Sequence, residues 1–177
     1  MKPDEATLVE ACLRHDQKAC RQLYDSYAPL MFGICMRYAR SRQAAEDILH
    51  EGFIKVFENL GKLRDTSQLA SWIRSLMVHT AVSAYRREHN VEALSDLTDE
   101  SVSSDADEIY GNIDIEVIMR AVQQLPTAYR MAFNLCDVEE YSFAEASEKL
   151  GIRESTVRSN LCRARRILAE KLADYTE

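Results

Sequence analysis

The sequence has few of the residues that break helices, with five glycines and three prolines among 177 residues. Such scarcity disfavours a β-architecture with many turns and favours long helices. There is no run of about 18 apolar residues, so no membrane span is expected. The N-terminus also lacks the apolar segment of a signal peptide. We therefore expect an all-α, cytoplasmic protein.

Paired cysteines and catalytic motifs are also missing. The five cysteines form no C-x-x-C pair, which argues against a disulfide framework or a zinc site. We expect them to be small buried residues in a reducing compartment, with a redox-sensing role for Cys12 and Cys20 as the less favoured alternative. The histidines are scattered and no glycine loop could cradle a phosphate, so neither catalysis nor a cofactor is indicated.

Basic residues are missing from one segment, and this explains the net charge of −7. Residues 1–90 contain 13 basic and 11 acidic residues, and residues 117–177 contain nine of each. Residues 91–116 contain nine acidic residues and no basic one. A net negative charge argues against nucleic-acid binding, but here both flanks of the acidic segment can still carry basic faces.

The acidic segment divides the chain. Its carboxylates are interleaved with serines, and such a stretch buries too little apolar surface to offset the entropy lost on ordering. We predict a helical domain at 1–90, a flexible acidic linker at 91–113 and a second helical domain at 114–177.

Apolar residues recur at helical spacing throughout the first domain. Asp16 and Ser41 are predicted N-caps, and Gly61 is the predicted C-cap of the helix that follows Ser41. Pro29 is predicted to sit in the first turn of a helix. A last helix is predicted from about Ser67 to Glu88.

The second domain is predicted to contain four helices and to end in a helix-turn-helix. Pro126 can open the second helix, and residues 142–145, Ser-Phe-Ala-Glu, have the form of a capping box that starts the third. That helix is short and ends at Gly151, which suits the positive φ of a tight turn. A basic amphipathic helix then runs from about Glu154 to Leu172.

Residues 152–172, the turn and the last helix, carry most of the basic residues of this domain: Arg153, Arg158, Arg163, Arg165, Arg166 and Lys171. The second helix of a helix-turn-helix can lie in the major groove, where arginine reads guanine edges and clamps phosphates. A solvated face on an ordinary surface helix would show a similar charge pattern. The capping box and the turn glycine favour DNA binding.

A second candidate interface is the helix from Trp72 to Arg87. It combines the aromatic side chains of Trp72, His79 and Tyr85 with several arginines. Aromatic rings together with cations suit the binding of unwound single strands. For Trp72 alone, the periodicity favours burial in the core over a role in binding.

A third candidate is the polar face of the helix between Ser41 and Gly61. Asp47 and Glu51, flanked by His50 and the hydrophobic Ile54, could dock on a protein partner. A solvated face is the more usual meaning of such a pattern.

Together these features resemble one known family, the bacterial sigma factors of the extracytoplasmic-function (ECF) type, a compact two-domain branch of the sigma-70 family. The resemblance covers about Leu8 to Leu172. Residues 45–57 look like the family's core-binding helix, and residues 69–73 look like the start of the helix that opens the minus-ten element. Residues 156–165 look like the recognition helix for the minus-thirty-five element. The matches occur in the family's order, with a linker between them.

The resemblance implies roles for individual residues. RNA polymerase core would be bound by Asp47, His50, Glu51, Phe53 and Ile54. The minus-ten element would be bound by Lys62 and Arg64, in the loop that captures a flipped base, and by Trp72, Arg74, His79, Arg86 and Arg87. The minus-thirty-five element would be bound by Ser155, Thr156, Arg158, Ser159, Arg163 and Arg166.

The sequence departs from the family pattern at several positions. The family usually has asparagine where His79 stands, glycine where Glu140 and Ser155 stand, and often a serine N-cap where Arg153 stands. These differences concern which promoter sequence is read.

The resemblance implies a transcription initiation factor that binds RNA polymerase core and promoter DNA, both double-stranded and melted. It also implies an anti-sigma factor as a further partner, and no enzymatic activity. One alternative is a one-component helix-turn-helix regulator that binds an operator without acting as a sigma subunit. Another is a helical adaptor that binds only protein.

Overall fold

The computed structural model of the chain describes residues 5–89 and 115–173. These residues form helices and no strand, and they divide into two compact units between Ala84 and Tyr85. The all-α fold with two helical domains is confirmed. The acidic linker predicted at 91–113 lies outside the described residues, so the division into 1–90, 91–113 and 114–177 stays a prediction.

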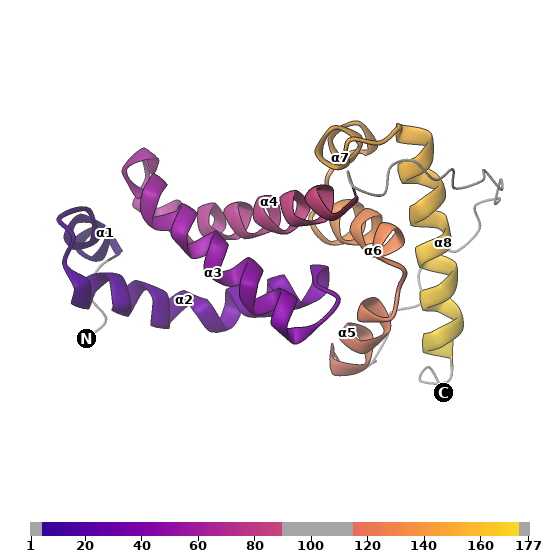
Figure 1. Cartoon of the computed structure of the whole chain (residues 1–177), viewed down its shortest axis with the longest axis horizontal. Coiled ribbons are helices and arrows are strands. Elements are labelled where there is room, and N and C mark those ends of the chain that lie inside the picture. The colour runs from indigo at the N-terminus through magenta and orange to yellow at the C-terminus, as the bar shows by residue number, and fades with distance from the viewer. Residues whose placement is uncertain (1–4, 90–114, 174–177) are drawn as a thin grey trace. The chain divides into compact units, whose positions relative to one another are not determined.

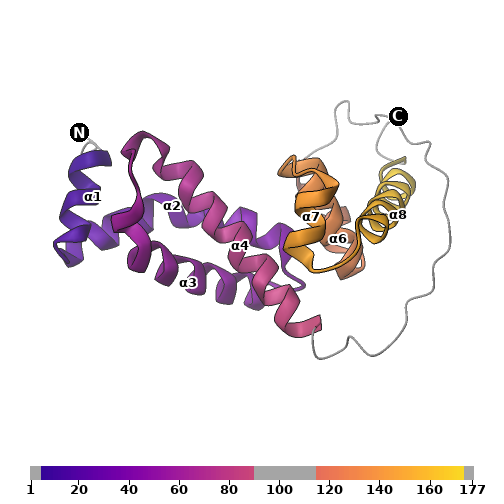
Figure 2. The same ribbon diagram turned by 90° about the horizontal axis from the view of Figure 1, so that it is seen from above.

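Residues 5–89 form four α-helices and two short 3-10 turns, and Figures 1 and 2 show the four helices. They are α1 (Glu5–Leu13), α2 (Gln17–Tyr38), α3 (Arg42–Asn59), η1 (Leu60–Lys62), η2 (Thr66–Gln68) and α4 (Leu69–His89). Helix α2 packs against both α1 and α3, and α1 also packs against η1 and η2. In the described part of the chain, no helix is long and apolar enough to cross a membrane.

Side-chain caps define where α2 and α3 begin. The Asp16 carboxylate accepts hydrogen bonds from the backbone amides of Lys18 (2.8 Å) and Ala19 (3.3 Å). The Ser41 hydroxyl accepts one from the amide of Ala44 (3.2 Å). These bonds satisfy amides that have no acceptor within the first helical turn. Both predicted N-caps are confirmed.

Two other predictions for this unit are wrong. Pro29 lies inside α2, not in the first turn of a new helix. Its position is exposed, where water can bond to the carbonyl group that loses its N–H partner. Gly61 does not cap α3 with a left-handed residue, because α3 ends at Asn59 and the chain continues into a 3-10 turn. The buried Leu60 anchors that turn.

A close contact between α3 and α4 forms part of the core of the first unit. Met77 of α4 is fully buried, and its thioether occupies the space that a side chain at Gly52 of α3 would need. Glycine therefore lets the two helices approach closely at this point. On the neighbouring side of α3, Phe53 is 3% exposed and its ring centroid lies 4.6 Å from that of Tyr24 on α2.

The second unit is built around its last helix. It contains α5 (Ile115–Gln123), α6 (Thr127–Phe133), the π turn η3 (Asn134–Val138), α7 (Phe143–Leu150) and α8 (Glu154–Leu172). Helix α8 packs against α5, α6 and α7. Its buried residues follow helical spacing along one face: Val157, Leu161, Ala164, Leu168 and Leu172. The four predicted helices are confirmed, and Pro126 directly precedes α6.

Helices α7 and α8 form the predicted helix-turn-helix. The Ser142 hydroxyl accepts from the Glu145 amide (3.3 Å), and the Ser142 amide donates to the Glu145 carboxylate (2.9 Å), which completes a capping box. Hydrogen bonds from the Ser142 hydroxyl and amide lower the pKa of the Glu145 carboxyl. Gly151 has a φ of +70°, and the Ser147 hydroxyl donates to the Ile152 carbonyl (2.6 Å) across the turn.

The turn before α7 contains a strained residue that yields a prediction. Glu140 has a φ of 59°, in the left-handed region that costs a residue with a Cβ roughly 1–2 kcal/mol. Glycine avoids this strain but loses more chain entropy on folding, so we expect Glu140→Gly to raise the free energy of unfolding by about 0.5–1 kcal/mol. Urea unfolding of the full chain measures the change.

Glu140→Ala is the matched control, because alanine removes the carboxylate but keeps the Cβ. It should give no comparable gain. An equal gain in both variants would mean that the carboxylate, not the backbone, is responsible.

Candidate nucleic-acid interface

The outward side of α8 is the principal candidate for DNA contact, because it lies opposite the buried stripe of this helix. Ser155, Thr156, Arg158 and Arg166 are exposed, and Ser159 and Arg163 are half-buried. All six residues predicted for the minus-thirty-five element therefore lie on or beside the solvent-facing side of one helix. A row of hydroxyl and guanidinium groups on such a side can donate to base edges and phosphates.

Arg158 is held in place by two neighbours. Its guanidinium carbon lies 4.3 Å from the centre of the Phe143 ring, and a guanidinium nitrogen lies 3.8 Å from the Glu154 carboxylate. Phe143 is the first residue of α7, so this contact joins the two helices of the helix-turn-helix. A cation over an aromatic face is oriented as well as attracted, which leaves Arg158 exposed but preorganised.

Two other arginines of α8 bind within the protein. Arg165 makes a two-pronged ion pair with Asp137, with distances of 2.9 and 2.7 Å, and so ties α8 to η3. Arg163 donates to the Tyr129 hydroxyl (3.2 Å) of α6. The basic residues of α8 thus divide into a group that holds the domain together and a group, including Arg158 and Arg166, directed at solvent.

Helix α4 presents a second row of candidate residues. Trp72, His79 and Arg86 recur every seven residues, which places them on the same side of the helix. His79 and Arg86 are exposed, as is Arg87, and Trp72 is half-buried. Arg74 is half-buried and lies two residues from Trp72, on a different side of the helix. The structure therefore brings Trp72, His79 and Arg86 together and separates Arg74 from them.

The loop that joins α3 to α4 carries the remaining two predicted residues, Lys62 and Arg64, and both are exposed. The Lys62 ammonium donates to the Asn59 side chain (2.6 Å).

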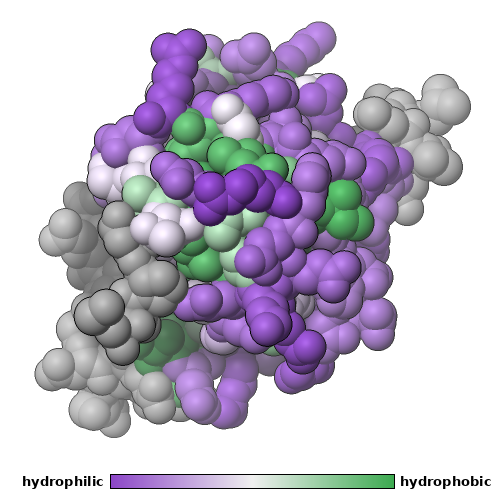
Figure 3. Space-filling view, turned by 90° about the vertical axis from the view of Figure 1, so that its left-hand side faces the viewer, coloured by the Kyte–Doolittle hydropathy of each residue, from purple (hydrophilic) through white to green (hydrophobic). Residues whose placement is uncertain are grey.

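The loop between α3 and α4 contacts α1, where a Cβ at Gly61 would lie 3.6 Å from the Leu13 side chain. Leu13 is itself 47% exposed. Figure 3, seen from the α1 side, shows an apolar patch surrounded by hydrophilic residues.

The outward side of α3 is a candidate protein-docking face. Asp47, His50 and Ile54 are exposed at helical spacing, and Ile54 is 58% exposed. Glu51 is half-buried beside them, and one of its oxygens accepts from Lys55 (2.8 Å). Phe53 faces the opposite way, into the core. The structure therefore brings four of the five predicted docking residues to one side of the helix and places the fifth in the core.

Two family models match this chain, one in each half. Residues 23–91 match the family model described as sigma-70 region 2, and residues 115–168 match the one described as sigma-70, region 4. The chain is a sigma factor of the sigma-70 family. It is therefore a transcription initiation factor, and the family is not one of enzymes.

Curated relatives place this sigma factor in the ECF type. It is 27% identical to the ECF RNA polymerase sigma factor SigM of Mycobacterium tuberculosis, over 95% of this chain and 84% of the relative. It is 25% identical to the ECF RNA polymerase sigma-E factor of Haemophilus influenzae, over 95% of both chains. It is 28% identical to the RNA polymerase sigma-H factor of Pseudomonas aeruginosa, over 93% of this chain and 92% of the relative.

A solved structure shares the fold. The sigma factor RpoE of Bartonella quintana, in complex with the anti-sigma factor NepR, has a TM-score of 0.51 and 22% identity. The match covers 86% of this chain and 96% of that one.

The cysteines of this sigma factor fit a structural role. Cys12 and Cys35 are buried, whereas Cys20, Cys136 and Cys162 are half-buried, and all five are free thiols. Burial, with the neighbouring Cys20, raises the pKa of Cys12 to about 12, and burial raises that of Cys35 to about 12. Thiols of such low acidity form little thiolate at neutral pH. Within the described residues no group of side chains could hold a metal ion.

The geometry around Arg158 yields a prediction. We expect Arg158→Ala to weaken promoter binding by roughly 1–3 kcal/mol if this side chain reads a base. We expect Phe143→Leu, which removes the ring under the guanidinium, to weaken it by about 0.5–1 kcal/mol. Fluorescence anisotropy of the polymerase complex on a promoter fragment measures both.

Lys171→Ala is the control, because it removes a positive charge from the last turn of the same helix. It should change affinity less than Arg158→Ala does. Equal losses in the two variants would mean that Arg158 contributes only its charge.

Proposed function

We propose that this sigma factor binds RNA polymerase core through the outward side of α3 and directs it to promoters through α4 and α8. The observation that carries the proposal is the order of exposed faces along the chain. An acidic and apolar face on α3 is followed by an aromatic and basic face on α4, and then by a polar and basic face on α8. Each lies opposite the buried side of its own helix.

Each face suits a different task. Asp47, His50 and Ile54 offer charge and apolar surface to a protein. Trp72, His79 and Arg86 offer stacking and cationic contacts to a melted strand in the minus-ten element, with Lys62 and Arg64 close by in the loop. The polar side of α8 suits the major groove of the minus-thirty-five element. Joining both domains to polymerase raises their effective concentration at the promoter, so each contact can be weak alone.

The same proposal includes a cellular setting and an inhibitor. The Bartonella quintana relative was solved in complex with an anti-sigma factor, and we propose a partner of this kind here. A factor that acts on polymerase and promoter DNA works in the bacterial cytoplasm. The one-component regulator is less well supported, since residues 23–91 match sigma-70 region 2 and not a ligand-sensing domain.

Run-off transcription with bacterial polymerase core tests the function. The purified protein plus core should give discrete transcripts from a pool of genomic fragments of the source bacterium, whereas core alone should give none. An operator-binding regulator would bind DNA without core and would yield no transcript. Absence of any promoter-specific transcript would contradict the proposal.

A charge reversal tests the docking face. We expect Asp47→Arg combined with Ile54→Glu to abolish co-purification with core, because both side chains are exposed on the outward side of α3. Glu51 is left unchanged because it binds Lys55. Asp25→Arg, on the exposed side of α2, is the control and should co-purify normally. Retained binding by the double variant would place the docking face elsewhere.

A further inference from the structure

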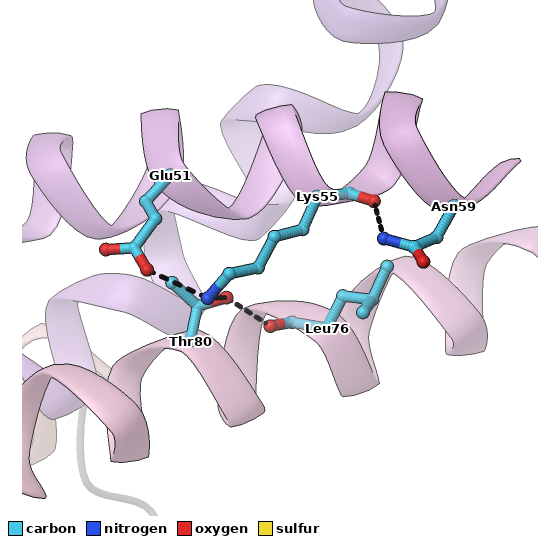
Figure 4. Close-up of polar contacts among 5 residues, drawn as sticks. All are labelled: Glu51, Lys55, Asn59, Leu76 and Thr80. Carbon is cyan, nitrogen blue, oxygen red and sulfur yellow. Dashed lines mark hydrogen bonds and ion pairs between the residues drawn. The ribbon is translucent and has the colours of Figure 1, made fainter.

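A polar bridge joins α3 to α4 near the Gly52–Met77 contact (Figure 4). The Lys55 ammonium donates to the Glu51 carboxylate (2.8 Å) and to the Thr80 hydroxyl (3.3 Å). The Thr80 hydroxyl in turn donates to the Leu76 carbonyl (2.8 Å) within α4. At the other end, the Asn59 side chain donates to the Lys55 carbonyl (2.8 Å) within α3.

The donors and acceptors of the bridge fit without conflict. A hydroxyl has one proton, and that of Thr80 goes to Leu76, which leaves its oxygen lone pairs for the ammonium. Thr80 is fully buried, so its oxygen depends on protein donors. The Lys55 and Glu51 side chains are 28% and 33% exposed, and a partly buried ion pair is screened less by water than one at the surface.

The position of the bridge links it to both proposed faces. Glu51 directly follows His50, which lies on the docking side of α3. Thr80 directly follows His79, which lies on the promoter side of α4. The bridge therefore runs from Glu51, one of the predicted docking residues of α3, to Thr80, which adjoins a predicted promoter residue of α4.

Burial of apolar surface is non-directional, so a hydrogen bond adds a constraint of a different kind to the packing of α4. Met77 is unbranched and flexible, so its contact at Gly52 tolerates small rotations of α4. A hydrogen bond to a charged donor has narrower geometric limits. The Lys55–Thr80 bond thus restricts α4 in a way that the apolar contact does not.

We propose that Lys55 is a positioning residue that holds the promoter side of α4 in a set orientation relative to the docking side of α3. Through Thr80 it orients Trp72 and His79, so that they meet the melted strand once polymerase is bound. This inference rests on the proposed function, because the two sides that Lys55 orients are the proposed docking and promoter faces. It assigns Lys55 no contact of its own with polymerase or DNA.

The experiment separates polymerase binding from promoter opening. Lys55→Met keeps the length and apolar stem of the side chain and removes its charge. We expect its affinity for core to fall far less than its promoter opening, although Glu51 loses its ion-pair partner. We expect the open-complex fraction, measured by permanganate reactivity of unpaired thymines on a fragment selected in the run-off assay, to fall about tenfold, as for loss of one hydrogen bond to a charged group. Lys55→Arg, which can donate to both partners, should restore most of the opening.

A pair of changes at Thr80 tests the same bond from α4. Thr80→Val keeps the shape and removes the hydroxyl, whereas Thr80→Ser keeps the hydroxyl. Only Thr80→Val should lower opening, and combining it with Lys55→Met should add little further loss, since both remove one bond. These variants also decide the matter if Lys55→Met does not fold.

Arg42→Met is the matched control on the same helix. It breaks the Arg42–Glu46 ion pair (2.9 Å), which has the same i, i+4 spacing but lies at the surface. It should leave opening unchanged.

The outcomes are distinguishable. Normal opening by Lys55→Met and Thr80→Val overturns the inference and leaves the proposed function intact. An equal fall in core affinity and opening, with a lowered melting temperature, also overturns it, because that pattern indicates general destabilisation. Failure of the unmodified protein to support any promoter-specific transcript counts against the proposed function itself.

Discussion

The close approach of α3 and α4 at Gly52 and Met77 is the contact on which the first unit depends. Met77 fills the space beside a residue without a side chain, and the inward residues of both helices, such as Phe53 and Ile73, are buried. The sides that remain outside are then determined. Asp47 and His50 are left facing solvent on α3, and His79 is left facing solvent on α4. The proposed docking and promoter faces thus lie on the sides of α3 and α4 that packing leaves exposed, and the Lys55–Thr80 hydrogen bond adds a polar link between the two helices.

The second unit uses the same principle with one long helix. Burial of the apolar stripe of α8 against three shorter helices leaves its opposite side polar. The role of each arginine of α8 then depends on its position on the helix. Arg165 and Arg166 are adjacent and both exposed, but Arg165 closes an ion pair with Asp137 of η3. Adjacent residues of the same type therefore serve different purposes.

Much of the fold could be predicted from local patterns. Helical periodicity located the helices, and short polar side chains at Asp16, Ser41 and Ser142 marked where three of them begin, because a cap depends only on residues a few positions away. Local rules failed where tertiary packing overrides them. Pro29 remains inside α2 because buried residues on both sides, Leu23 and Met31, continue the helix. Similarly, burial of Leu60 holds a 3-10 turn over residues 60–62, so the helical path does not end at Gly61.

Each candidate site was predicted as a list of residues. The structure shows that some of these residues are exposed and that others contact neighbouring helices. Phe53 was predicted to bind polymerase core, but its tilted ring contact with Tyr24 was not visible in the sequence because Tyr24 lies on another helix. The pairing of Phe143 with Arg158 was missed for a similar reason, although both residues stood in the predicted helix-turn-helix. Lys55 gave no signal in the sequence beyond its spacing from Glu51.

The sequence by itself determined the helical class, the concentration of negative charge in residues 91–116, and the helix-turn-helix with its capping box and turn glycine. Each follows from composition or from contacts within a few residues. Only the tertiary structure decided which charged side chains face solvent and which hold helices together. That depends on pairs such as Arg165 with Asp137 and Lys55 with Thr80, which are separated by 25 residues or more in the chain and are brought together by packing alone.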